Sequence, residues 1–176
     1  VEPRGKVFRL REWRPQRVSV PGPILGRFAL AAGALALSWS VGSLFAALGP
    51  TLATTLLGIQ NRAQAGLIVV AFQLCGGVFQ VLARSQSARR TLSLGPLLMT
   101  GGMVLCVLGF QWLFAPFFML GALVAASGFG MTFVGSAAAL NRAAPAAQRG
   151  EVSSAFYLVG YATMTVPVLG VGFAFP

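Results

Sequence analysis

Apolar residues occupy the chain in long blocks, and short polar or basic stretches separate the blocks. The first block, between Phe28 and Asn61, contains no charged residue. About 20 apolar residues carry a helix across a bilayer, so this block is long enough for one crossing and too short for two crossings joined by a turn. The same reasoning along the chain predicts an all-α, polytopic membrane bundle of five transmembrane helices, at residues 28–57, 65–82, 92–110, 117–140 and 152–173.

The composition supports this prediction and argues against several kinds of enzyme. Hydrophobic residues make up 56% of the chain and charged residues 9%, whereas a typical soluble domain carries about 25% charged residues. The chain has three acidic residues and no histidine, and Glu151 is the only acid beyond Glu12. A metal site of histidines and carboxylates, or a Ser-His-Asp triad, therefore lacks the residues to form it. We expect neither catalytic residues nor a metal or other cofactor.

The positive charge follows the pattern of membrane topology and not that of a nucleic-acid-binding face. The formal net charge is +10, and six of the thirteen lysines and arginines lie within the first 20 residues. With five spans, the basic groups within 1–27, 84–90 and 142–149 share one side of the membrane, and Arg62 alone lies on the other. Because cytoplasmic loops are enriched in Lys and Arg, we expect the N-terminus in the cytoplasm and the C-terminal end outside. Residues 1–25 are then a basic cytoplasmic linker attracted to anionic headgroups.

Two segments separated by 84 residues resemble each other. Residues 63–76 and 147–160 are identical at seven of fourteen positions, and extension back to Ser43 gives eleven identities over 34 positions, where composition alone gives about three. The first predicted helix then corresponds to the fourth and the second to the fifth. A repeat unit of three helices inverts its second copy, as in secondary transporters. The alternative is convergence of apolar composition.

This repeat predicts the domain organisation. Residues 26–110 form the three-helix repeat A, and residues 111–176 form the incomplete inverted repeat B with two helices. The third helix of repeat B is expected near residue 175, where the sequence ends, so we expect the chain to be a fragment of a longer protein.

Two loops carry residues that resemble signatures of the major facilitator superfamily. Residues 77–90 are similar to a degenerate copy of its Gly-x-x-x-Asp-Arg-x-Gly-Arg-Arg loop, with Arg84, Arg89 and Arg90 present and the Asp and loop glycine absent. Residues 145–153 are similar to its Pro-x-x-x-Arg-Gly-x-x-Ser segment, and Trp13 with residues 21–23 resembles the central loop. The resemblance implies helices seven to eleven of an alternating-access carrier, whose partners are the bilayer, a small-molecule substrate and a missing N-terminal half.

Polar and aromatic side chains within the predicted spans are candidates for a substrate cavity, because lipid cannot satisfy their hydrogen bonds. Residues 152–173 carry a polar stripe along one helical face, and Gln73 and Gln80 share a face of the second helix. The candidates are Trp39, Ser40, Ser43, Gln73, Gln80, Ser154, Tyr157, Tyr161 and Thr165. The alternative for each serine and threonine is a hydrogen bond to its own helix, and the tyrosines could belong to an interfacial belt.

A second group of residues is expected at the cytoplasmic loops as a gate. Its members are Arg84, Arg89, Arg90, Pro145, Arg149, Gly150 and Glu151. The arginines either set the topology or form a latch that pairs with acids of the other half. Glu151 is well placed at the positive end of a helix, and we interpret it as a cap or as a member of a gate ion pair.

The sequence therefore favours a secondary transporter of small solutes, with efflux as one option, in a bacterial-type inner membrane. It would work by alternating access, without chemistry on the substrate and without a nucleic-acid partner. Two alternatives are a five-helix scaffold or assembly subunit and a membrane-embedded lipid-modifying enzyme. The enzyme is disfavoured because Glu151 is the only acid available in the apolar body.

Overall fold

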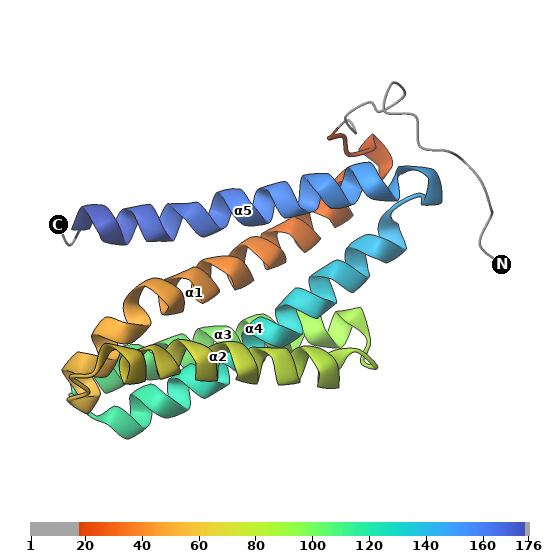
Figure 1. Cartoon of the computed structure of the whole chain (residues 1–176). Coiled ribbons are helices and arrows are strands. Elements are labelled where there is room, and N and C mark those ends of the chain that lie inside the picture. Colours follow the sequence, from red (N-terminus) through yellow and green to blue (C-terminus); the bar gives the residue numbers. More distant parts are fainter. Residues whose placement is uncertain (1–17, 175–176) are drawn as a thin grey trace, which may run out of the picture.

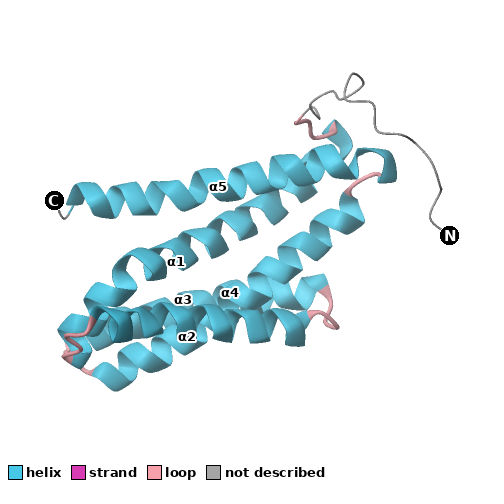
Figure 2. Ribbon diagram, viewed as in Figure 1, coloured by secondary structure: helices cyan, strands magenta, loops and turns pink. Residues whose placement is uncertain are grey.

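The computed structural model describes residues 18–174, and these form an all-α bundle (Figure 1, Figure 2). Two short 3-10 turns, η2 (Gly22–Ile24) and η3 (Ala146–Gln148), precede the first and last helices. Five helices are long and apolar enough to cross a membrane, which confirms the prediction of a polytopic membrane protein. They are α1 (Leu25–Leu57), α2 (Arg62–Ala83), α3 (Ala88–Gln111), α4 (Ala115–Ala143) and α5 (Arg149–Ala174). Most of the predicted basic linker, with Trp13, lies outside the described residues.

Each helix begins a few residues before its predicted apolar run, and in α2, α3 and α5 polar residues form the first turn. Asn61 caps α2, where its side-chain oxygen accepts hydrogen bonds from the backbone N–H groups of Ala63 (2.9 Å) and Gln64 (3.3 Å). Ser87 caps α3 by accepting from the backbone N–H of Arg90 at 3.3 Å. The sequence boundaries followed hydrophobicity alone, so they placed both helix starts several residues too late.

Replacement of the Asn61 cap is expected to lower the free energy of unfolding. Asn61→Ala leaves two backbone N–H groups without their acceptor and is expected to cost about 1 kcal/mol. Asn61→Ser keeps an acceptor and should retain most of that stability. The measurement is equilibrium unfolding in mixed micelles. Gln60→Ala, at the exposed neighbouring position, is the control, and an equal loss in both alanine variants would contradict the assignment of the cap.

Successive helices run antiparallel, so the loops alternate between two ends of the bundle (Figure 1). The start of α1, the α2–α3 loop and the α4–α5 connection lie at one end, which we call the basic end. The α1–α2 loop, the α3–α4 loop and the end of α5 lie at the opposite end. Of the arginines in residues 18–174, only Arg62 begins a helix at the opposite end. The basic end carries Arg27, Arg84, Arg89, Arg90, Arg142 and Arg149.

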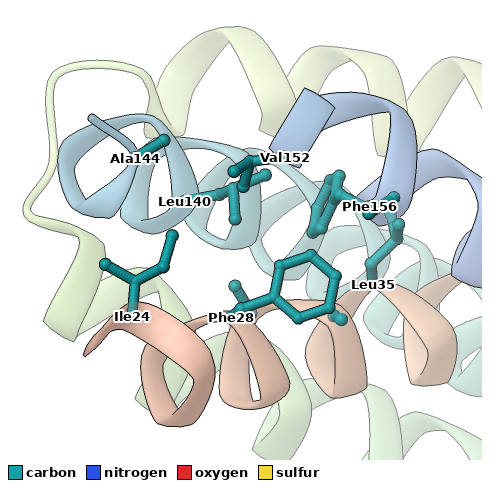
Figure 3. Packing of buried hydrophobic residues seen from close by; sticks show 10 residues of the cluster. Ile24, Phe28, Leu35, Leu140, Ala144, Val152 and Phe156 are labelled. Atoms are coloured by element: carbon teal, nitrogen blue, oxygen red, sulfur yellow. The ribbon is translucent and has the colours of Figure 1, made fainter. Parts of the chain in front are cut away.

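Two clusters of buried apolar residues hold the bundle together. The first lies towards the basic end, where the starts of α1 and α5 meet the end of α4 (Figure 3). Its members include Ile24, Phe28, Leu35, Leu140, Val152 and Phe156. The second lies towards the opposite end and joins α1, α2, α3 and α4 through residues such as Phe45, Phe72, Met99 and Phe118. Both α1 and α4 contribute to the two clusters and so join the two ends of the bundle.

The closest helix pair is α3 with α4, and glycine makes this approach possible. A Cβ added at Gly102 would overlap the backbone nitrogen of Ala125, and one added at Gly121 would lie 2.7 Å from the carbonyl oxygen of Gly102. Small residues let membrane helices pack backbone against backbone. Both helices place buried glycines every seven residues, the period of one helix face: Gly95, Gly102 and Gly109 on α3, and Gly121, Gly128 and Gly135 on α4. We call this contact the glycine seam.

Candidate functional site

A cavity of about 750 Å³ lies between α1, α2, α4 and α5. It opens at the middle of the helices, since Trp39 and Ser43 lie near the midpoint of α1 and Phe129 lies near that of α4. Five of the predicted cavity residues, Trp39, Ser43, Gln73, Gln80 and Tyr161, line it together. The other lining residues are Gly42, Ala46, Ala47, Phe129, Phe133, Met164 and Val168.

Trp39 is the centre of an aromatic group on this wall. Its ring lies nearly parallel to that of Phe133, with centroids 6.4 Å apart and 20° between the planes. The ring of Tyr161 meets it edge-on at 5.0 Å. A Cβ at Gly160 would lie 3.0 Å from the Trp39 ring, so the missing side chain of this glycine lets the indole lie directly against α5.

The Phe129 ring reaches the cavity because two residues that face it on other helices are glycines. A Cβ at Gly42 of α1 would lie 3.0 Å from the Phe129 ring, and a Cβ at Gly76 of α2 would lie 2.8 Å from it. The ring also packs against Phe72, with centroids 5.6 Å apart. Side chains at Gly42 and Gly76 would therefore displace this wall of the cavity.

The polar groups of the cavity include the Gln73 and Gln80 carboxamides on α2, the Ser43 hydroxyl on α1 and the Tyr161 hydroxyl on α5. Gln73 and Gln80 lie two helical turns apart, about 10 Å along the axis of α2, and carboxamides both donate and accept hydrogen bonds. The Ser43 hydroxyl donates to the carbonyl oxygen of Ser40 at 2.8 Å, which leaves its oxygen lone pairs to accept. Within the part of the chain that the structure describes, none of the cavity-lining side chains carries a formal charge.

The remaining four predicted cavity residues lie away from the wall. The hydroxyl of Ser154 donates to the Gly150 carbonyl and that of Thr165 to the Tyr161 carbonyl, at 2.9 and 3.0 Å, as in the alternative considered for serine and threonine. Ser40 donates across to the carbonyl oxygen of Thr163 at 3.3 Å and so ties α1 to α5. Tyr157 is 41% exposed and contacts Trp39 with ring centroids 6.3 Å apart. Their part in transport stays a prediction.

Sequence reasoning missed the apolar part of the wall, Phe129, Phe133 and Met164. In a helix that is apolar all round, the type of an apolar residue does not tell which face it occupies. The one signal was indirect: glycine lies at the matched repeat positions Gly76 and Gly160, and each makes room for an aromatic ring.

The predicted gate residues gather at the basic end. Arg84, Arg89, Arg90, Pro145, Arg149 and Gly150 are exposed there. Glu151, in the first turn of α5, is half-buried and accepts a hydrogen bond of 2.5 Å from the Ser19 hydroxyl. Within residues 18–174, the partner that the structure gives Glu151 is therefore a hydroxyl and not an arginine. This contact fastens the segment that enters α1 to the start of α5.

The fold and the cavity define a polytopic helical membrane protein with an uncharged, aromatic central cavity. Comparison with protein-family models, with curated proteins and with solved structures gives no match. Membership of the major facilitator superfamily therefore stays a prediction from the sequence.

Proposed function

We propose that the chain is part of a secondary active transporter of small solutes that works by alternating access, of the major facilitator type. The observation that carries this proposal is the cavity of about 750 Å³, lined from four helices at their midpoints. Ligand sites of transporters lie near the midplane, between helices of two repeats, and 300–1,000 Å³ is the range of small-molecule sites.

The pairing of the helices supports an inverted repeat. The offset of 84 residues equates α1 with α4 and α2 with α5, so the pair α1–α5 corresponds to the pair α4–α2. Both pairs are in contact along the bundle. The correspondence is incomplete, because α1 and α2 are in contact while the matching pair, α4 and α5, barely touches. The matched residues Phe72 and Phe156 are both buried, with exposed fractions of 2% and 1%. In this arrangement α3 has no counterpart within residues 18–174.

Transport in this proposal is a rocking movement of the five-helix unit against the other half of the carrier. The glycine seam and the two buried clusters keep the unit rigid, because closely packed interiors do not deform continuously. The exposed Arg84, Arg89 and Arg90 are free to pair with acids of the other half when the cytoplasmic side closes. Setting the topology is their alternative role.

Orientation in the membrane is part of the proposal, with the basic end in the cytoplasm. Fusions that follow Gln60 or Leu113 are expected to give active alkaline phosphatase, which folds outside the cytoplasm. Fusions that follow Gln86 or Ala147 are expected to give fluorescent green fluorescent protein, which folds inside it. The reversed pattern in a bacterial host would refute the assignment.

The experiment that tests transport uses the full-length protein in proteoliposomes. Counterflow and gradient-driven uptake are measured for a panel of radiolabelled aromatic, cationic, anionic and sugar solutes, with protein-free liposomes as the control. Saturable flux of any member above the control supports a carrier. Binding without flux, or no flux for the whole panel, argues against it.

A further inference from the structure

We infer that the central cavity binds planar aromatic solutes that are neutral or carry one positive charge. This inference rests on the proposed function, since it names the substrate class of the same site. Four aromatic rings from three helices face the cavity: Trp39 on α1, Phe129 and Phe133 on α4, and Tyr161 on α5. Aromatic rings bind other rings through offset-stacked and edge-to-face contacts, and such walls suit a flat ring system better than a flexible chain.

The uncharged lining of the cavity disfavours anions. Among residues 18–174, the lining contains no arginine or lysine to pair with a negative charge, and an unpaired anion is costly to remove from water. Arg27, which precedes Trp39 on α1 by 12 residues, lies about 18 Å away along the helix axis. A cation meets the negative faces of the rings instead, and these attract it.

The two carboxamides restrict the solute further. Gln73 and Gln80 come from α2, which contributes none of the four rings. Each offers both a donor and an acceptor, so a ring system with a polar edge gains hydrogen bonds on this side while its faces contact the rings. A lipid acyl chain would leave both carboxamides without partners, and this disfavours it as the occupant.

The test measures binding to the purified full-length protein in nanodiscs by equilibrium dialysis. The probes are ethidium (a planar cation), phenazine (planar and neutral), pyrenesulfonate (a planar anion) and tetrapropylammonium (a cation without rings). Ethidium and phenazine are expected to bind at least about ten times more tightly than the other two. Equal binding of all four probes, or preference for the anion, would overturn the inference.

Matched variants tie this binding to the cavity. Trp39→Leu removes the central ring and is expected to weaken ethidium and phenazine binding about ten-fold. Trp112→Leu, at an exposed position that follows α3, should leave binding unchanged. Trp39→Phe keeps an aromatic ring, and its affinity for ethidium and phenazine should stay within about three-fold of the parent. This variant still tests the site if Trp39→Leu does not fold. Equal binding by Trp39→Leu and the parent would contradict the site.

Failure of this inference can be told apart from failure of the proposed function. Saturable flux of an anion or a sugar, with no binding of the aromatic probes, would support the proposed carrier and refute the substrate class inferred here. Binding of ethidium that depends on Trp39, without flux of any solute, would support the aromatic binding site and refute the proposal of a transporter.

Discussion

Gly102→Ala is expected to destabilise the protein strongly, whereas Gly101→Ala at the next position is not. A Cβ at Gly102 would overlap the backbone nitrogen of Ala125 and lie 2.6 Å from the carbonyl oxygen of Gly121. Backbone atoms cannot turn away as a side chain can, so α3 and α4 must separate. Overpacking of an interior typically costs 1–3 kcal/mol, and we expect about 3 kcal/mol here because backbone must move.

Gly101 is the matched control, because it lies on the same helix and a Cβ there would meet nothing within 4 Å. Alanine is intrinsically favoured over glycine in a helix by about 1 kcal/mol, so Gly101→Ala should be neutral or slightly stabilising. The measurement is reversible unfolding in mixed micelles. Gly128→Ala, on the α4 side of the seam, should behave like Gly102→Ala. Equal stabilities for Gly101→Ala and Gly102→Ala would show that the glycine seam is wrong.

Gln73→Ala is expected to reduce transport by about ten-fold in kcat/KM. Loss of one hydrogen bond to a solute held in a cavity typically costs 1–3 kcal/mol, and about 1.4 kcal/mol corresponds to a factor of ten. Gln80→Ala, which removes the second carboxamide of the cavity, should have a similar effect. The measurement is the initial rate of uptake into proteoliposomes at several solute concentrations.

Gln64→Ala controls for the loss of a glutamine from the same helix. Gln64 is exposed near the start of α2 and does not line the cavity, so flux should remain within about two-fold of the parent. Unchanged flux in the Gln73→Ala and Gln80→Ala variants would remove the carboxamides from the transport path. A ten-fold loss in Gln64→Ala would point to a general defect in α2.

The number and class of the helices could be predicted because the bilayer constrains them so strongly. Backbone groups in lipid have to be satisfied within the helix, so a long uncharged run such as that between Phe28 and Asn61 has few alternatives. The helix ends were less accurate, since capping by Asn61 and Ser87 depends on single polar side chains outside the apolar runs.

The candidate site was predictable only in its polar part. Gln73 and Gln80 stand out in an apolar helix, and the structure brings them to one cavity with Trp39, Ser43 and Tyr161. Ser154 and Thr165 stand out equally in the sequence, yet each bonds to a carbonyl of its own helix. Ser43 also bonds to a carbonyl of its own helix and still lines the cavity. A serine or threonine can satisfy its hydroxyl in this way on any face of a helix, so residue type alone does not tell which hydroxyls reach the cavity.

The sequence by itself determined five helices of membrane-spanning length, their antiparallel order and the concentration of arginines at one end. These properties follow from local hydrophobicity and from charge counted along the chain. Only the tertiary structure decided that α3 and α4 form the closest pair, that Phe129 fits into the space left by Gly42 and Gly76, and that residues from four helices line one open cavity. In lipid, apolar side chains gain little from choosing one neighbour over another, so the shape of the packed surfaces, and not their hydrophobicity, selects the partners.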